Sequence, residues 1–358
     1  MFGKKTYVGV DFGHHTIKAA FVEKSPQGWK ITKAGWVPTP ADCIKDGIIT
    51  NPEPVSVALK ALLRHTGIAA KNAIVSVQGS TVVVRTVRMP RMAEHVLRKS
   101  IRFEAGRYVP TSIEEAYIEF EIMGDADDGQ MDVLIVAAPK DYVESRVKAA
   151  EMAGLEVESV DVSPFAAYRS LVETDDTKNW EEETFALIDL GSGANTVSVV
   201  TCGQFAMTRT ITSGHGAALT DALKTFFDLS QEDAEAGKSA LDVTALLDDK
   251  PQENPPLRVL HPYLDELVRE IRRSLNYYES QAVDGQQPRP IKAVVLTGGG
   301  AKLTGLDQYL SAKLGIPVAT MGAFENPRLT NQTPHDFGSG HEFSVVAGLA
   351  MRPYVKAA

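Results

Sequence analysis

Cysteine is scarce in this chain: among its 358 residues only Cys43 and Cys202 carry a thiol, and they lie far apart. So few cysteines exclude a disulfide framework of the kind that small secreted proteins use, and they predict reduced thiols. No apolar run approaches the roughly 20 residues that a membrane-spanning helix needs. A strand pattern, instead of the apolar helix of a secretory signal, follows Lys4 and Lys5. These absences predict a cytoplasmic protein.

Excess positive charge is lacking as well. The formal net charge of −9 at pH 7 gives no general attraction to nucleic acid or to anionic lipid. We therefore expect no nucleic-acid partner, and contact with a membrane only through other proteins. The length of 358 residues is sufficient for two domains with cores of their own.

Two stretches, far apart in the sequence, follow one pattern: an apolar strand, then Asp-apolar-Gly, a short polar turn and a second apolar strand. The first spans 8–22 and the second 187–200. Glycine beside a turn lets the backbone approach an anion closely, and the turn N–H groups form an anion-binding concavity. Two such hairpins imply two similar halves that face each other across a nucleotide. The residues that we assign to nucleotide binding in these turns are Asp11, Gly13, His14, His15, Thr16, Lys18, Asp189, Gly191, Ser192 and Gly193.

Each hairpin carries one carboxylate at the place where phosphates are expected. Phosphates cannot lie beside bare carboxylates, so Asp11 and Asp189 predict a Mg²⁺ ion whose water shell separates them from the phosphates. Lys18 supplies a point charge and Thr16 a hydroxyl group. For either hairpin alone, an ordinary tight turn that contains Asp and Gly is the alternative. The presence of two copies favours the nucleotide.

A glycine triplet forms a third element. The apolar strand pattern of 293–297 leads into Gly298, Gly299 and Gly300, and a helix pattern follows that ends near Gly315. A strand, a glycine loop and a helix N-terminus together make a contact for an anion or a nucleotide. As a lone feature, a glycine triplet more often forms a tight turn.

In this order, the two hairpins and the glycine triplet resemble the phosphate and adenosine motifs of the actin-like ATPase superfamily. Actin, heat-shock chaperone ATPases, sugar kinases and the division protein FtsA belong to it. Segment 234–238 is similar to a helix of relatives whose Glu and Lys, here Glu235 and Lys238, contact ribose and adenine, and 344–350 is similar to a helix near their hinge. The resemblance implies ATP as the ligand, to which we also assign Gly214, and an α/β fold of two duplicated RNase H-like domains.

Within the superfamily the chain resembles the PilM family of type IV pilus assembly. The similar segments are the opening motif with Asp11 and Lys18 and the stretches 47–77, 87–90 and 149–155. This resemblance implies a cytoplasmic protein at the inner face of the inner membrane. It also implies a groove, between the first subdomain and an inserted one, for the N-terminal cytoplasmic tail of the inner-membrane protein PilN. Other pilus platform and motor proteins are further implied partners.

The pattern of elements divides the chain into two domains and an insert. We assign 1–89, 156–180 and 335–358 to the first actin-like domain, 90–155 to an inserted subdomain of the FtsA and PilM type, and 181–334 to the second, with a smaller helical subdomain at about 215–290. Strands are predicted within 7–36, 73–77, 81–89, 116–122, 131–138 and 184–211, and helices within 52–67, 92–107, 141–153, 215–247 and 257–283. Loops are predicted at 124–129, 173–183, 251–256 and 322–342.

The helix predicted at 92–107 combines apolar and basic residues. Its apolar residues include Val96 and Phe103, and its basic residues are Arg91, Arg98, Lys99, Arg102 and Arg107. A basic, partly apolar groove suits an extended peptide. The alternative is a stripe that faces the core beside a solvated charged face.

Two departures from the superfamily pattern bear on mechanism. His14 and His15 stand where PilM relatives carry small serines, and adjacent side chains point in different directions. We therefore expect hydrogen bonds to phosphate more than a shared metal. Many hydrolysing relatives place a water-orienting Glu before a Pro-x-Ala-Ala pattern, where this chain has Ser163. Serine is a poor base without a partner, so we expect weak or no hydrolysis; Asp161, on the same strand face, is the alternative base.

Three functions compete at this point. The first is a nucleotide-binding pilus assembly protein that a peptide recruits to the membrane. The second is an FtsA-like division protein, which binds membranes through a C-terminal amphipathic helix that we do not expect after 344–350. The third is a small-molecule kinase, which needs an acid or base aimed at its substrate, and Ser163 argues against it. We expect the first.

Overall fold

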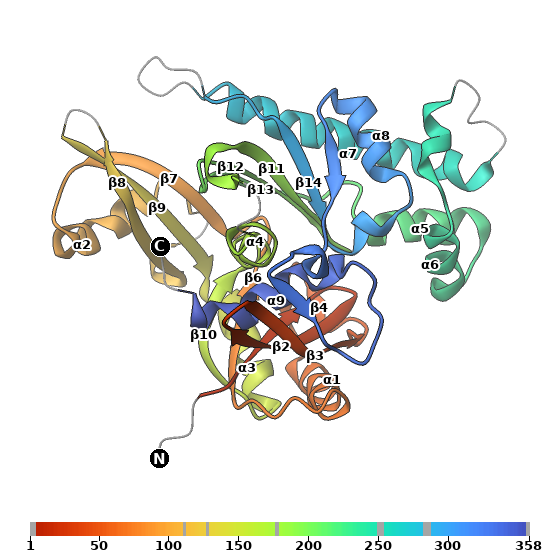
Figure 1. Cartoon of the computed structure of the whole chain (residues 1–358), viewed down its shortest axis with the longest axis horizontal. Helices are drawn as coiled ribbons and strands as arrows, with labels where there is room; N and C mark the ends of the chain where they lie inside the picture. The colour runs from red at the N-terminus through yellow and green to blue at the C-terminus, as the bar shows by residue number, and fades with distance from the viewer. Residues whose placement is uncertain are drawn as a thin grey trace.

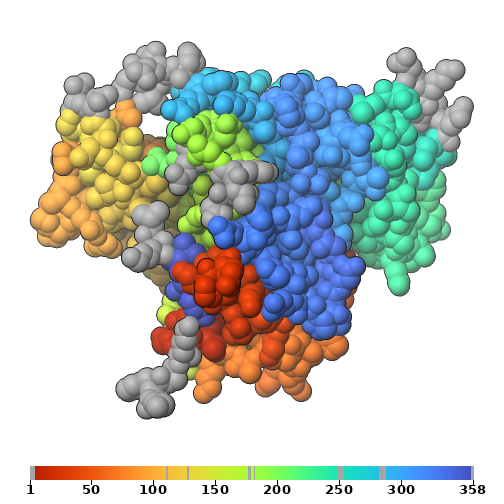
Figure 2. All heavy atoms as spheres, in the orientation of Figure 1, coloured from red at the N-terminus to blue at the C-terminus, as the bar shows by residue number. Residues whose placement is uncertain are grey.

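The structure is a computed structural model that describes residues 5–109, 112–126, 129–175, 179–248, 254–281 and 288–355. Two large sheets form its centre, one for each half of the chain, and the segment between β7 and β9 projects from one side (Figure 1). Figure 2 shows this projection and the helices α5 and α6 at opposite sides of the molecule. No helix of the described ranges has both the length and the apolar character needed to cross a membrane.

The first sheet has six strands in the order β10-β6-β1-β2-β3-β16. Their bounds are β1 Tyr7–Phe12, β2 Thr16–Ser25, β3 Gly28–Pro38, β6 Asn72–Val77, β10 Glu156–Val162 and β16 Leu329–Asn331. Side chains alternate between faces along a strand, so Val8 and Val10 pack against α1 and α3, whereas Ala20 and Val22 pack against α9. These helices are α1 Pro52–His65, α3 Lys140–Met152 and α9 Ser344–Met351.

The second sheet repeats this plan with five strands in the order β13-β12-β11-β14-β15. Their bounds are β11 Thr184–Leu190, β12 Asn195–Thr201, β13 Gln204–Ile211, β14 Ala293–Thr297 and β15 Val318–Thr320. One face packs against α5 Gly216–Phe227, α7 Pro255–Glu279 and α8 Leu306–Leu314, and α6 Gln231–Ser239 lies beside α5. Phe185 and Leu187 on the other face meet Leu349 of α9 and Ala166 of α4 Ser163–Tyr168, so α9 and α4 lie between the two sheets.

The projecting segment is a three-stranded antiparallel sheet in the order β7-β9-β8, covered by one helix. Its elements are β7 Val83–Pro90, α2 Glu94–Ala105, β8 Ala116–Ala126 and β9 Gln130–Pro139. Two short strands of the first half, β4 Ile44–Lys45 and β5 Ile48–Ile49, pair with each other in a separate small sheet. The apolar stripe predicted for α2 is wrong in part. Leu97 and Ile101 are buried, but Phe103 is 77% exposed and Val96 44% exposed.

Three further predictions about elements are corrected. Pro255 and Pro256 begin α7 instead of ending a loop, because proline suits the first turn and the Asn254 side chain caps the N–H of Leu257. The predicted loop at 322–342 contains β16, which pairs in parallel with β3. The predicted turn at 124–129 starts later, since β8 runs to Ala126; residues 127–128 and 251–253 lie outside the described ranges.

Candidate functional site

The turns of the two Asp-apolar-Gly hairpins meet between the two sheets. In the first, Gly13 N–H donates to the carbonyl oxygen of Thr16 at 3.1 Å, and the Thr39 hydroxyl donates to the Gly13 carbonyl at 2.7 Å. In the second, a Cβ atom added to Gly193 would lie 3.0 Å from the Cβ of His14. The two turns are therefore in van der Waals contact, although they are about 180 residues apart in the sequence.

Two carboxylates and one ammonium group lie beside these turns. Lys18 Nζ is 3.3 Å from Asp11 Oδ2, and both side chains are about seven-eighths buried. Burial, and secondarily the charge of Asp11, raise the pKa of Asp189 to about 6, while Lys18 acts in the opposite direction. Within the described part of the chain, no cation lies within ion-pair distance of Asp189. The site therefore has a negative charge that lacks a direct partner.

This donor set fits Mg²⁺ that is bound together with phosphates. Magnesium is usually held by one or two carboxylates, with water and substrate phosphates as the remaining ligands. Among the described residues there is no group of three or more His, Cys, Asp or Glu side chains that suits a metal. Asp11 and Asp189 alone would leave most coordination positions to water and phosphate oxygens, as the chemistry of this ion requires.

The glycine triplet packs against the second hairpin. Gly298 has a φ of 82°, and a Cβ atom there would clash with Asp189 Oδ1 and lie 2.7 Å from the Leu190 carbonyl oxygen. A Cβ on Gly300 would lie 2.8 Å from the Cβ of Leu190, whereas Gly299 has open space beside it. Packing thus requires Gly298 and Gly300, and Gly299 is free to face a ligand. The helix predicted directly after the triplet is wrong in its start, because a 3₁₀ turn, Gly299–Lys302, precedes α8.

Glu235 and Lys238 form a polar cluster on α6. Lys238 Nζ lies 2.8 Å from Glu235, and it donates to the Thr220 hydroxyl at 2.8 Å and to the Gly216 carbonyl at 3.3 Å. Burial raises the pKa of Glu235, but hydrogen bonds from Lys238 and Thr220 outweigh burial and lower it. Because Gly216 N–H bonds the Gly191 carbonyl at 3.0 Å, this cluster is directly connected to the second turn.

The sequence did not reveal the part that His215 plays. Its Nδ1 lies 2.6 Å from the Ser192 carbonyl oxygen and 3.3 Å from the N–H of Ala218, so the ring joins the second turn to the start of α5. Burial lowers the pKa of His215, which favours the neutral ring at pH 7. Gly214 just before it has a φ of 61° and packs on α7, where an added Cβ would lie 2.8 Å from the Cβ of Leu267.

Ser163 is at the start of α4, and it is 1% exposed. Its hydroxyl donates to the Ser76 hydroxyl at 3.1 Å and to the Val77 carbonyl at 3.4 Å, both at the end of β6. The expectation that Asp161 shares a strand face with Ser163 is wrong, because β10 ends at Val162. Asp161 is instead paired with Arg169 at 2.9 Å and Arg352 at 3.4 Å, and it is not a free base.

A groove of about 930 Å³ lies next to this region, where the projecting sheet meets the second half. Its walls are the loop Gln78–Ser80, strands β7 and β13, and the C-terminal end of α7. Both strands are at the edges of their sheets. Side chains join the walls, because Thr86 donates to the Phe205 carbonyl at 3.1 Å and Arg85 to the Tyr277 hydroxyl at 3.1 Å.

The basic residues of α2 do not line this groove. Two arginines of this segment have local ion pairs, Arg98 with Glu94 at 2.9 Å and Arg107, just after α2, with Glu104 at 2.9 Å, and Arg102 donates to a backbone carbonyl. The interpretation as a core stripe beside a solvated charged face holds for Leu97 and Ile101, whereas Val96 and Phe103 are exposed.

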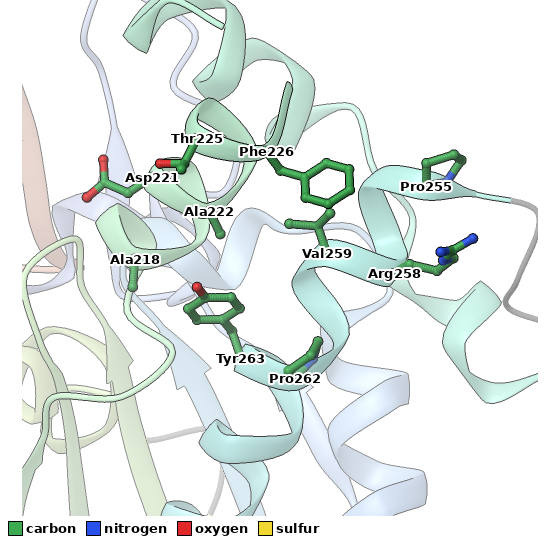
Figure 3. A pocket seen from close by; sticks show the side chains of 10 residues that line it. All are labelled: Ala218, Asp221, Ala222, Thr225, Phe226, Pro255, Arg258, Val259, Pro262 and Tyr263. Atoms are coloured by element: carbon green, nitrogen blue, oxygen red, sulfur yellow. The ribbon is translucent and has the colours of Figure 1, made fainter. Parts of the chain in front are cut away.

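A separate pocket of about 700 Å³ lies between α5 and α7 (Figure 3). Phe226 and Val259 point toward each other across it, and Tyr263 and Pro262 line its other end. Phe226 is 67% exposed, so the pocket is open to solvent. None of its lining residues belongs to either hairpin turn.

We expect the ligand-free protein to lose stability as pH rises through the titration of Asp189. The pKa of this carboxyl is 3.8 when free and about 6 in the folded protein, so the folded state holds the proton more tightly. The tighter binding of this proton adds to the free energy of unfolding, fully below the unfolded-state pKa, and the gain is lost as pH rises to about 6. At about 1.4 kcal/mol per pKa unit, the gain is at most ~3 kcal/mol. Asp189→Asn should therefore be more stable than wild type above pH 6 and equally stable near pH 4. Urea unfolding in EDTA measures this difference, and parallel pH profiles of the two proteins would contradict it.

Comparisons with known proteins agree with this architecture. A family model described as type IV pilus assembly protein PilM matches residues 9–354. Cell division protein FtsA of Streptococcus pneumoniae serotype 2 (strain D39 / NCTC 7466) is 23% identical over 353 residues, which cover 87% of this chain and 74% of that protein. FtsA of Bacillus subtilis (strain 168) is 23% identical over 266 residues, which cover 67% of this chain and 59% of that protein.

Solved structures show the same fold. A PilM-PilN type IV pilus biogenesis complex aligns with a TM-score of 0.83 at 24% identity, over 98% of this chain and 99% of that chain. Ethanolamine utilization protein EutJ from Carboxydothermus hydrogenoformans aligns with a TM-score of 0.56 at 16% identity, over 98% and 90%. MreB5 of Spiroplasma citri bound to ADP aligns with a TM-score of 0.52 at 12% identity, over 96% and 95%. The predicted actin-like α/β fold is confirmed.

Proposed function

The chain belongs to the PilM family of type IV pilus assembly proteins, and from this premise we propose that it binds ATP with Mg²⁺ between its halves and a peptide of PilN in a groove. The observation that carries the nucleotide part is the contact between the two Asp-apolar-Gly turns. A structural relative bound to ADP supports the same ligand class. A structural relative that is a complex of PilM with PilN supports the partner.

The roles of the residues follow from their places. Asp11 and Asp189 would hold Mg²⁺ through water, and the ion would offset the charge of the phosphates when both are bound. Backbone N–H groups of the turns, with Lys18 and Thr16, would hold the phosphates, and His14 and His15 would donate further hydrogen bonds. Glu235 and Lys238 would contact ribose and adenine. The nucleotide residues that we propose are Asp11, Gly13, His14, His15, Thr16, Lys18, Asp189, Gly191, Ser192, Gly193, Gly214, Glu235, Lys238, Gly298, Gly299 and Gly300.

We expect the nucleotide to act as a conformational ligand with weak or no hydrolysis. Ser163 stands at the water-orienting position, and its hydroxyl is bonded to Ser76. Asp161 is engaged by two arginines. A site that lacks a free carboxylate at this position holds ATP without activating water efficiently.

The groove beside β7 and β13 is our candidate for the peptide site, and it differs from the expected groove between the first subdomain and the insert because it lies between the insert and the second half. Strand edges carry backbone N–H and C=O groups, and those of β7 and β13 that are not used between the two walls can bond an extended peptide in the groove. The walls also supply the side chains of Arg85 and Arg289, which suit acidic or carbonyl groups of a peptide, whereas Arg88 is paired with Asp132 at 2.9 Å. Bound there, the N-terminal tail of PilN would hold this protein at the cytoplasmic face of the inner membrane, close to other pilus platform and motor proteins.

A native cysteine reports on the groove. Cys202 is exposed and lines the groove, whereas Cys43 is buried, so a thiol reagent should modify Cys202 selectively. We expect a synthetic PilN tail peptide, at a concentration that gives about 90% occupancy of the site, to slow maleimide labelling of Cys202 by about tenfold, because only the free tenth of the protein then reacts. Mass spectrometry of the labelled protein measures the rate.

A scrambled peptide of the same composition is the matched control and should leave the labelling rate unchanged. Cys202→Ser should show no labelling under the same conditions. Tight binding of the peptide without protection would move the peptide site away from this groove. If the protein binds Mg·ATP but does not bind the peptide at all, the FtsA-like alternative, which the 23% identity supports, becomes the better reading. Phosphorylation of small molecules in a kinase screen would favour the less expected third function.

A further inference from the structure

Arg146, on the inner face of α3, is a charged side chain in an unusual place. It is 2% exposed, and among the described residues no ion pair joins its guanidinium to a carboxylate. Nη1 donates to the Tyr142 carbonyl at 3.1 Å, the guanidinium carbon lies 3.9 Å from the centroid of the Tyr142 ring, and Nε has no hydrogen-bond partner. A buried charge without an ionic partner is costly, so a purely structural reason for arginine here is weak.

Helix α3, which carries Arg146, packs on the sheet that holds the first hairpin. Burial lowers the pKa of Arg146, while Tyr142 and then Asp11 oppose that effect. Helix α3 packs against β6, the parallel neighbour of β1, and Val10 pairs with Val75, so Asp11 lies beside Ser76, two residues before Gln78. Arg146 and Tyr142 thus act on the end of β6, which lies beside the carboxylate that we assign to the metal and phosphates.

Tyr142 connects Arg146 to the groove. The ring is 4% exposed, and its hydroxyl donates to the carbonyl oxygen of Gln78. Gln78 and the following Gly79 belong to the loop that leaves β6, enters the projecting sheet and lines the groove. Gly79 has a φ of 132°, and a Cβ atom there would lie 3.2 Å from the Tyr142 hydroxyl oxygen, so the ring and the loop are in close contact.

The same loop is fixed from the nucleotide side as well. The Ser163 hydroxyl bonds the Ser76 hydroxyl and the Val77 carbonyl, the two residues that precede Gln78. Side chains from α3 and α4 therefore converge on the end of β6. A shift at either side chain changes the position of a wall of the groove.

We propose that Arg146 and Tyr142 couple the nucleotide site to the peptide groove, so that bound Mg·ATP increases the affinity for the peptide. This proposal rests on the proposed function. The net negative charge of Mg·ATP beside Asp11 attracts the unpaired guanidinium, which holds the Tyr142 ring beneath it. The ring holds Gln78, and the loop Gln78–Ser80 is then ordered before the peptide arrives. By linkage, the peptide increases the affinity for Mg·ATP by the same factor.

Tyr142→Phe is the sharpest variant, because it keeps the ring beneath Arg146 and removes only the bond to Gln78. Peptide affinity is measured by calorimetry with and without the Mg²⁺ complex of a non-hydrolysable ATP analogue. For wild type we expect nucleotide to tighten peptide binding on the order of tenfold, within the usual range of coupling. For Tyr142→Phe we expect a factor of about two or less, with nucleotide affinity itself changed by no more than about twofold.

Two further variants separate charge from packing. Arg146→Met keeps the volume but removes the charge, and it should lose coupling as Tyr142→Phe does. Arg98→Met, on the exposed face of α2, removes a cation that pairs with Glu94, and it should retain the wild-type factor. If Arg146 is only a packing residue, its variant loses stability and keeps the coupling factor, which would overturn the proposal. Equal peptide affinity with and without nucleotide in wild type would overturn it as well.

Hydrogen exchange keeps the test independent of the peptide. Nucleotide should slow exchange of the Gly79 and Ser80 amides in wild type by several-fold and leave it unchanged in Tyr142→Phe. If the peptide does not bind but this protection appears, the proposed function fails and the connection to the loop stands. If the peptide binds but nucleotide gives no protection, the connection fails and the proposed function stands.

Discussion

Asp11→Asn is expected to lower the affinity for ATP in the presence of Mg²⁺ on the order of 10- to 100-fold, the usual loss when a group that orients a metal is changed. The substitution keeps shape and hydrogen-bonding capacity but removes the charge that would hold the hydrated ion. It also leaves Lys18, 3.3 Å away, without its anionic partner. Lys18 then acts on the phosphates alone, which recovers part of the lost attraction and keeps the loss finite. Calorimetry with ATP and excess Mg²⁺ measures the change.

Two comparisons make this result specific to the metal. In EDTA no ion lies between the Asp11 carboxylate and the phosphates, so the carboxylate repels ATP and wild type loses its advantage. Wild type and Asp11→Asn should then bind ATP with affinities within a few-fold of each other. Asp125→Asn removes an acid that is 59% exposed and pairs with Arg91 on the projecting sheet, and its affinity should equal that of wild type. An Asp11→Asn protein that binds Mg·ATP as tightly as wild type would remove Asp11 from the metal site.

The sequence predicts those parts of the site that depend only on the spacing of neighbouring residues, namely the two hairpins with their Asp and Gly. In an antiparallel hairpin, Asp, apolar and Gly at consecutive positions place the carboxylate at the strand end and the glycine in the turn. This is why Asp11 pairs with Lys18 across the strands, and Asp189 with Thr196. Because the pattern occurs twice, it predicted two similar sheets. Each hairpin needs further strands beside it, paired in parallel with its first strand, to bury its apolar side chains.

Features that depend on tertiary contacts were out of reach. Arg146 follows an ordinary helical pattern, so nothing in the sequence distinguishes its buried guanidinium from a solvated one. The sequence names Phe103 as apolar but does not say whether its ring is buried, because helical periodicity gives the apolar face and not the width of the surface that covers it. β16 has three residues and pairs with β3 about 300 residues away, so no local pattern predicts it.

Gly348→Ala is expected to destabilise the protein by about 1–3 kcal/mol, the usual range for overpacking a dense core, and Gly348→Val by more. Gly348 lies in α9, between the two sheets, where a Cβ atom would clash with the Ala166 carbonyl oxygen of α4 and lie 2.5 Å from its carbonyl carbon. These are backbone atoms that cannot rotate away. Arg169 also donates to the Gly348 carbonyl at 3.0 Å, so a shift of α9 strains a second contact. Urea unfolding followed by circular dichroism measures the loss.

Helix propensity works against this prediction, and a second helical glycine separates the two effects. Replacing glycine by alanine inside a helix gains up to about 1 kcal/mol where the methyl group has room. Gly237 in α6 has open space beside it, so Gly237→Ala should become more stable by about that amount. At Gly348 the same gain is smaller than the cost of moving α9 away from α4. Because α9 contacts both sheets, that displacement also separates the two hairpin turns, and nucleotide affinity should fall together with stability. A Gly348→Ala protein as stable as wild type would mean that α4 and α9 can separate freely, and that the contact between the halves does not depend on this crossing.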